Sequence, residues 1–290
     1  MYQNMQDMIR LTKEQNIPLF ELVLRNEMRL TEKEESEIWY ELSMRYAVMK
    51  ESAAKALFEE GKTVGNLITG ITKQHYQYTQ TKDTVCGSFI NQVMARALSC
   101  SEVNASMGKI CAAPTAGSCG ILPAVLITLQ EERAYSERKI LEGLMVASGI
   151  GAVIVKNATI SGAEGGCQAE CGVAAAMAAA AVVYLSGGSN EMVMESVAFS
   201  LMNCMGLVCD PVAGLVQVPC AQRNASQAVN ALISADLALG GMKSVIPPDQ
   251  VIDAMYKVGK MLPLSLKETA MGGIANTPKG KQIAKEIFGK

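Results

Sequence analysis

The stretch Gly172–Leu185, GVAAAMAAAAVVYL, decides the fold class. It carries no charge, and alanine has the highest intrinsic helix propensity. A helix that is apolar on every side is typical of a buried position, and small side chains let neighbouring helices approach it closely. The stretch is shorter than the roughly 20 residues that span a bilayer. We therefore predict an all-α protein, a compact multi-helix bundle with buried Ala- and Gly-rich central helices.

Helix-breaking residues divide the chain on both sides of this stretch. The turn SGAEGG at 161–166 precedes Cys167 and opens the alanine-rich helix. Pro211 disfavours helix just before itself, and Pro219 precedes the next helix. No convincing strand alternation is found, since the best candidate, 214–218, is short. Further helices are expected at 84–100, 121–132, 136–155, 190–207 and 220–239, with a final pair after Pro247-Pro248.

The composition changes near residue 81. Residues 1–80 are polar and amphipathic, and Thr31 followed by Glu34 resembles a capping box that opens a helix. After Thr81 the charges thin out, and Gly, Ala, Ser and Cys become frequent. We predict an N-terminal helical segment at 1–80 that packs on a larger helical domain at 81–290, the two forming one continuous domain.

Charge and the N-terminal sequence exclude several classes of protein. The chain has 26 basic and 28 acidic residues and no basic stripe, which argues against nucleic-acid binding. The N-terminus, MYQNMQDMIRL, lacks the basic region and apolar core of a signal peptide. We expect a cytoplasmic protein that binds neither membrane nor nucleic acid.

The nine cysteines are the strongest chemical signal in the sequence. In a reducing cytoplasm they are not expected to form a disulfide framework. The single histidine, His75, makes histidine-based zinc sites, serine triads and haem ligation hard to build. Any metal would therefore be held by thiolates. His75 itself is expected to have a surface or structural role.

Three cysteines stand at breaks in the predicted helices. Cys167 follows a glycine pair, Cys209 precedes Asp210-Pro211, and Cys220 follows Pro219. A thiol at a helix N-terminus has a lowered pKa, which favours the metal-binding thiolate. Their spacing matches neither a zinc ribbon nor a ferredoxin pattern. Two interpretations stay open: small buried side chains, or a dispersed metal site assembled by the fold.

Polar residues interrupt the apolar part of the chain near these cysteines: Lys156-Asn157, Glu164, Glu170 and Arg223-Asn224. Burial of an unpaired charge is costly, which suggests a function for them. Capping or a satisfied position in the core explains them equally well. The glycines at 162–166 could cradle a phosphate at the helix start, or could simply allow close packing.

Three segments around these residues resemble motifs of the bacterial iron–sulfur L-serine dehydratases. They are 102–123 with Ala113-Pro114-Thr115, KNATISGAEGGCQAE at 156–170, and CDPVAGLVQVPCAQRN at 209–224. The resemblance covers nearly the whole chain and is strongest from 84 to 240. It implies a helical lyase without pyridoxal phosphate that converts L-serine into pyruvate and ammonia. It also implies a 4Fe-4S cluster on Cys167, Cys209 and Cys220, with one iron open to substrate, in a cluster-binding catalytic domain at 81–290.

The sequence departs from the family pattern at two points. Single-chain relatives carry an additional N-terminal α/β domain with no counterpart in this sequence. The chain therefore resembles the alpha chain of the two-subunit type, which needs a beta chain, and homo-oligomers are a further expectation. Ala116 stands where many relatives have asparagine, so no side-chain role is assigned there. The remaining cysteines are assigned to packing: Cys86, Cys100, Cys111, Cys119, Cys171 and Cys204.

The resemblance also suggests roles for the polar residues. Lys156 and Glu164, beside the cluster motif, are the candidate bases for the α-proton of L-serine. Ser161 and Thr115 could position the substrate carboxylate or hydroxyl. Arg223 suits the carboxylate through its planar fork of donors, and its neighbour Asn224 is the remaining substrate-binding candidate.

Three rival interpretations are kept. A cysteine desulfidase-type cluster lyase would use the same elimination with a different leaving group. A pyridoxal-phosphate dehydratase would need no thiolates. A non-catalytic helical scaffold protein would merely pack its cysteines, and it leaves the polar residues around Cys167 and Cys220 unexplained.

Overall fold

The computed structural model describes residues 1–81 and 83–289, and this part of the chain is all-α, which confirms the predicted fold class. The only pairing of β type within these ranges is an isolated bridge between Cys209 and Lys267. The α-helices are α1 (Met5–Gln15), α2 (Leu19–Thr31), α3 (Glu35–Phe58), α4 (Ile71–Thr79), α5 (Gly87–Ala105), α6 (Ile121–Arg133), α7 (Glu137–Asn157), α8 (Gly162–Gly165), α9 (Cys167–Leu185), α10 (Asn190–Asn203), α11 (Cys220–Leu239), α12 (Pro248–Met261) and α13 (Pro278–Phe288). Short 3-10 turns are η1 (Val64–Asn66), η2 (Val212–Gly214), η3 (Leu264–Leu266) and η4 (Gly273–Asn276).

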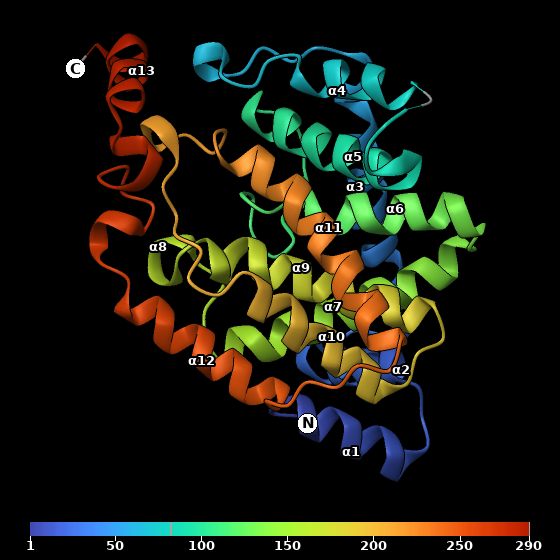
Figure 1. Ribbon diagram of the computed structural model, residues 1–290. Coiled ribbons are helices and arrows are strands. Elements are labelled where there is room, and N and C mark those ends of the chain that lie inside the picture. The colour runs from blue at the N-terminus through green and yellow to red at the C-terminus, as the bar shows by residue number, and fades with distance from the viewer. Residues whose placement is uncertain (82, 290) are drawn as a thin grey trace.

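Helix α9 lies at the centre of the bundle (Figure 1). It packs against α6, α7, α10 and α11, and nearly all of its side chains are buried. By length and composition α7 and α9 could each cross a membrane, but 67% and 89% of their apolar windows are buried inside the protein. The core helix of a soluble protein has the same properties, so the buried-helix interpretation accounts for both.

Glycines on these helices allow the closest approaches. A Cβ built on Gly172 would lie 2.3 Å from Sγ of Cys204, and one on Gly143 would lie 2.9 Å from Cγ of Leu185. Real Cβ atoms essentially never come this near to another heavy atom. Gly172 therefore brings α9 against the end of α10, and Gly143 brings α7 against α9.

This packing generates a stability prediction. We expect Gly172→Ala to lower the free energy of unfolding by about 1–3 kcal/mol, because the added methyl overpacks the contact with Cys204. The double variant Gly172→Ala/Cys204→Ala removes the clash and gains roughly 1 kcal/mol of helix propensity, so it should exceed the single variant in stability. Urea unfolding followed by circular dichroism measures both, with Cys204→Ala as the control. Equal stability of Gly172→Ala and the wild type would contradict the packing.

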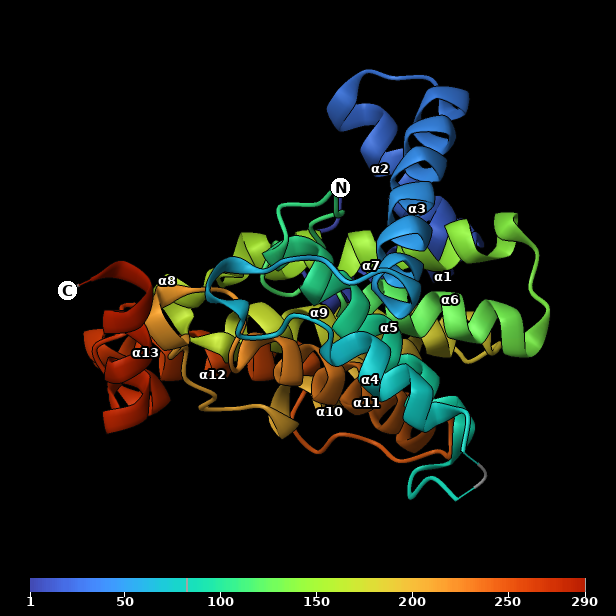
Figure 2. The ribbon, with the colours of Figure 1, turned by 90° about the horizontal axis from the view of Figure 1, so that it is seen from above.

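The N-terminal helices share the core of the rest of the chain. Helix α3 packs against α5 and α6, and α2 packs against α7. Tyr46 and Met49 of α3 belong to the same buried apolar cluster as Ile121 and Val146. Figure 2 shows α2 and α3 rising from one side of the bundle. The expected boundary near residue 81 stays a prediction, and it adjoins residue 82, which lies outside the described residues.

One predicted helix start is wrong. Thr31 does not cap a helix but is the last residue of α2, where its hydroxyl donates to the carbonyl of Glu27 at 2.8 Å. Helix α3 begins at Glu35 instead, with a capping box made by Glu34 and Glu37. The carboxylates of Glu34 and Glu37 accept hydrogen bonds from free backbone amides at the start of α3. The sequence pattern had assigned this capping role to Thr31.

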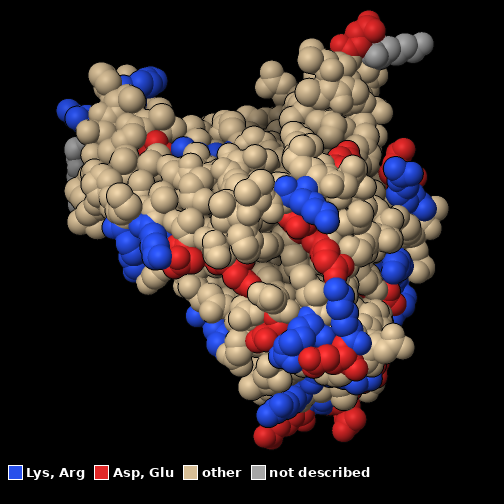
Figure 3. Space-filling model, turned by 60° about the horizontal axis from the view of Figure 1, so that its bottom comes forward, with Lys and Arg blue, Asp and Glu red and all other residues tan. Residues whose placement is uncertain are grey.

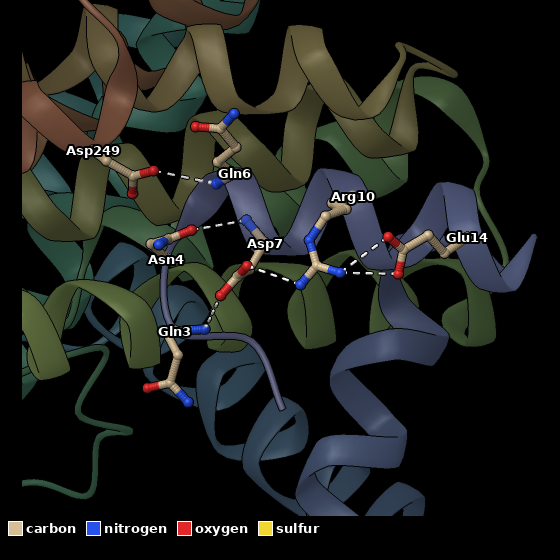
Figure 4. Close-up of polar contacts among 7 residues, drawn as sticks. All are labelled: Gln3, Asn4, Gln6, Asp7, Arg10, Glu14 and Asp249. Atoms are coloured by element: carbon tan, nitrogen blue, oxygen red, sulfur yellow. Dashed lines mark hydrogen bonds and ion pairs between the residues drawn. The ribbon is translucent and has the colours of Figure 1, made fainter.

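The start of α1 is fixed to α12 by a carboxylate (Figure 4). Asn4 accepts from the amide of Asp7 at 2.8 Å. Asp249, in the first turn of α12, accepts from the amides of Met5 at 2.9 Å and Gln6 at 3.2 Å. The first amides of a helix lack partners within it and carry partial positive charge, so a carboxylate stabilises them. Two segments that are 244 positions apart in the sequence are thereby held together.

Charged side chains of both signs mix on the surface. On the face drawn in Figure 3, Lys and Arg side chains stand beside Asp and Glu side chains. Arg10 forms ion pairs with Asp7 and Glu14, and Lys13 pairs with Glu191. This face therefore offers no field of a single sign that would attract a polyanion.

Candidate functional site

The three cysteines singled out in the sequence stand at the ends of structural elements. Cys167 is the first residue of α9, and Cys220 is the first residue of α11. Cys209 lies in the β-bridge with Lys267. Their exposed fractions are only 2%, 9% and 3% respectively. All three thiols are thus in the interior, at points where the backbone changes direction.

The pKa shifts of these thiols indicate one common site. Burial, and then the charge of Cys167, raise the pKa of Cys220 to about 12. Burial and then Cys167 likewise raise the pKa of Cys209. A hydrogen bond from Cys171 lowers the pKa of Cys167, and the positive charge of Arg223 acts in the same direction. A negative charge on one thiolate disfavours ionisation of a neighbouring thiol. All three thiols would therefore be ionised together only with added positive charge nearby.

The backbone around Cys209 is held by a segment that comes much later in the chain. The amide of Cys209 donates to the carbonyl of Leu266 at 2.9 Å, and the amide of Glu268 donates to the carbonyl of Cys209 at 2.7 Å. Asp210 accepts from the amide of Ile274 at 2.8 Å. Residues 264–276 therefore form one wall of the site, and no sequence motif indicated this.

Arg223 ties the start of α11 to residues 208–210, on either side of Cys209. Its guanidinium forms an ion pair with Asp210, 2.8 Å from Nη2 to Oδ1, and donates from Nη1 to the carbonyl of Val208 at 2.8 Å. Both side chains are largely buried, with 16% and 3% exposed. Loss of either partner of such a pair leaves an uncompensated charge.

Asn224 joins α11 to the loop that carries Thr115. Its Oδ1 accepts from the amide of Gly120 at 2.9 Å. Its Nδ2 donates to the carbonyl of Gly117 at 2.7 Å and to that of Cys220 at 2.9 Å. The side chain is 1% exposed. Its amide is therefore fully used in holding the loop, and its predicted contact with substrate stays a prediction.

Thr115 faces a carboxylate for which the sequence predicted no catalytic role. Its Oγ1 donates to Oε1 of Glu170 at 2.5 Å and lies 3.0 Å from Oγ of Ser118. Glu170 stands one turn into α9, half-buried, and burial raises its pKa. In the sequence, Glu170 is recognisable only as a charge within an apolar stretch, and no specific role was assigned to it.

Lys156 lies at the surface end of α7, away from the residues described so far. Its Nζ donates to Oε1 of Gln3, and Nδ2 of Asn157 donates to the carbonyl of Gln3 at 2.8 Å. This polar pair holds the N-terminal residues on α7. Its predicted role as a base stays a prediction.

Glu164 and Ser161 lie on the turn before α9. Glu164 is exposed, forms an ion pair with Lys260 and accepts from Thr159 at 2.7 Å. The hydrogen bond from Lys260 lowers the pKa of Glu164. Ser161 is the N-cap residue of α8, but its side chain makes no capping bond. It adjoins Gly162, where a Cβ would lie 3.0 Å from Sγ of Cys209. The predicted roles of both residues stay predictions.

The other cysteines are free thiols. Cys86 is exposed and Cys111 is partly buried. Cys100, Cys119, Cys171 and Cys204 are buried, as expected for cysteines that pack as small apolar residues. His75 is partly buried, and burial lowers its pKa. Its ring lies beside that of Tyr78, and among the described residues no hydrogen bond or ion pair links it to the three-cysteine site.

The helix arrangement and the group of buried thiols, with an arginine and a carboxylate nearby, define an all-α protein with a cysteine-rich interior. The sequence model of the serine dehydratase alpha chain family matches residues 14–275. The chain belongs to the serine dehydratase alpha chain family.

Three relatives illustrate the similarity. A probable L-serine dehydratase alpha chain of Bacillus subtilis (strain 168) is 44% identical over 290 residues, covering 100% of this chain and 96% of the relative. The L-serine dehydratase alpha chain of Peptoniphilus asaccharolyticus is 45% identical over 282 residues, with 97% of each covered. L-serine dehydratase 2 of Escherichia coli (strain K12) is 36% identical over 280 residues, covering 94% of this chain and 61% of that protein.

The contacts of Asn224 generate a second prediction. We expect Asn224→Ala to lower the free energy of unfolding by about 3 kcal/mol, because the amide of Gly120 and the carbonyl of Gly117 are left buried without partners. Urea unfolding measures this, with Ser226→Ala, an exposed position on the same helix, as the control that should change little. A change below about 0.5 kcal/mol in the alanine variant would show that these bonds do not hold the loop.

Proposed function

We propose that this chain is the alpha subunit of an L-serine dehydratase, a lyase that converts L-serine into pyruvate and ammonia. Membership of the family supports this, as do relatives named for the activity that match nearly the full length of the chain. The observation that carries the proposal within the structure is the group of three buried thiols, Cys167, Cys209 and Cys220, in which the charge of Cys167 raises the pKa of the other two.

The three buried thiols are the proposed ligands of a 4Fe-4S cluster rather than of a single metal ion. Among the described residues, no group of three or more His, Cys, Asp and Glu side chains could hold one metal ion. In a cubane each thiolate binds a different iron, so the sulfur atoms stand farther apart than around one ion. We propose that Cys167, Cys209 and Cys220 hold such a cluster, with one iron open to substrate and no pyridoxal phosphate. When bound, it would act as a Lewis acid that stabilises charge on a departing oxygen.

The remaining residues of the site would bind and orient L-serine. Arg223 lies within electrostatic reach of Cys167 and Cys220 and suits the substrate carboxylate, although its fork already engages Asp210. Thr115 and Ser161 are proposed to orient the hydroxyl or the carboxylate. Asn224 would contribute by fixing the Thr115 loop.

The assembly follows from the names of the relatives. Two of them, matched over at least 96% of their length, are described as alpha chains. We therefore propose that a beta chain joins this subunit in the cytoplasm, and homo-oligomers stay a prediction. Cysteine desulfidation is the alternative reaction, and the ratio of kcat/KM for L-serine to that for L-cysteine distinguishes the two.

The thiolate proposal is tested by removing each sulfur. We expect anaerobically purified wild-type heteromer to contain iron and sulfide and to form pyruvate from L-serine. Cys167→Ala, Cys209→Ala and Cys220→Ala should each lose iron, and the rate should fall more than ~100-fold, since several kcal/mol of charge stabilisation are removed. Metal and sulfide analysis together with pyruvate assays measure this.

A matched control separates the site from cysteine loss in general. Cys86→Ala removes an exposed thiol and should keep both iron and activity. Full iron and sulfide content in all three site variants would refute the cluster assignment.

A further inference from the structure

Glu170 lies near all three thiols of the site, although Cys209 and Cys220 are far from it in the sequence. Its charge raises the pKa of Cys167, of Cys209 and of Cys220. Glu268 raises the pKa of Cys209 and Cys220 in the same way. The carboxylate of Glu170 therefore stands within electrostatic reach of each sulfur in the site.

Two glycines from different segments keep space open beside this carboxylate. A Cβ on Gly117 would lie 2.5 Å from Oε1 of Glu170. A Cβ on Gly162, the first residue of α8, would lie 3.0 Å from Sγ of Cys209, 3.1 Å from Oε2 of Glu170 and 3.5 Å from Oε2 of Glu268. A point just above Gly162 thus touches a proposed cluster ligand and two carboxylates, and a side chain there would fill it.

The two oxygens of Glu170 have different partners. Oε1 accepts from Thr115 at 2.5 Å. No hydrogen bond to Oε2 and no ion pair to this carboxylate is found among the residues that the structure describes. A buried carboxylate oxygen normally has a partner in the protein or in water. Glu164, by contrast, is exposed and paired with Lys260. Glu268 also reaches the space above Gly162 but is exposed, so Oε2 of Glu170 is the more buried of the two carboxylate oxygens that are left for a ligand there.

We propose that Glu170 is the catalytic base that takes the α-proton of L-serine, an inference that rests on the function proposed above. The bond from Cα to hydrogen breaks, and its proton moves to Oε2. The electron pair forms the double bond between Cα and Cβ as the bond from Cβ to oxygen breaks. The departing hydroxide takes a proton from solvent and leaves as water, giving 2-aminoacrylate. This tautomerises to the imine, which water hydrolyses to pyruvate and ammonia, while Glu170 returns its proton to solvent.

Thr115 is a positioning residue in this scheme. Its hydroxyl binds Oε1 and leaves Oε2 directed to the space above Gly162. The loop that carries Thr115 is held in turn by Asn224. Thr115 thus binds one oxygen of the carboxylate, and Gly162 leaves space beside the other.

The experiment uses the anaerobic heteromer with Glu170→Gln, which keeps the shape of the side chain, and Glu170→Asp, which keeps the charge but retracts it. Iron and sulfide content, KM and kcat for L-serine are measured, together with the deuterium isotope effect on kcat from L-serine labelled at Cα. The controls are Asp253→Asn, an exposed carboxylate paired on its own helix with Lys257, and wild type. Glu164→Gln and Glu268→Gln test the two rival bases, and loss of turnover in Glu268→Gln with normal turnover in Glu170→Gln would move the role to Glu268.

We expect Glu170→Gln to keep its iron and sulfide and a KM within about threefold, while kcat falls by roughly a hundred- to ten-thousandfold. Glu170→Asp should retain part of the rate with a larger isotope effect than wild type, because proton transfer becomes slower. A purely structural carboxylate would not change the isotope effect. Asp253→Asn should match wild type.

The assignment is overturned if Glu170→Gln keeps kcat within tenfold, if it loses the iron instead, or if Glu164→Gln alone abolishes turnover. Failure of the wild-type heteromer to form pyruvate from L-serine would reject the proposed function and this inference together. Turnover by wild type with normal turnover by Glu170→Gln rejects the inference alone.

Discussion

The close approach of neighbouring helices to α9 is the constraint on which the rest of the structure depends. Its alanines and Gly172 leave so little side-chain volume that α6, α7, α10 and α11 all pack directly on it. Protein interiors tolerate few voids, so the position of one helix fixes the others. The first turn of α9 carries Cys167 and Glu170, and α11 begins with Cys220. The packing of small residues therefore sets where the chemically important side chains meet.

The central helix and the helix breaks were predictable because their signals are local. Alanine content, proline and glycine decide the structure of a segment without reference to distant residues. Helix α11 has the bounds that the sequence analysis expected, whereas α10 ends at Asn203 rather than at residue 207. The Thr31 capping box was wrong, because several acidic residues compete for the same free amides and the pattern does not rank them.

The site was predictable in its cysteines but not in its walls. The bridge from Cys209 to Lys267 depends on tertiary packing, and residues 264–276 carry no motif of their own. Lys156 stood next to a recognisable motif, yet it reaches towards Gln3 rather than towards the thiols. Glu170 was visible as a charge in an apolar stretch, but only the fold shows that Thr115 and two glycines surround its carboxylate.

The bridge between Cys209 and Lys267 also affects how the protein matures. The ribosome synthesises the chain from its N-terminus, and residues 264–276 are made more than 50 residues after Cys209. Until that segment has emerged from the exit tunnel, Cys209 lacks the backbone partners that hold it in place. The surroundings of Cys209 are therefore completed only after this later segment has been made and folded back.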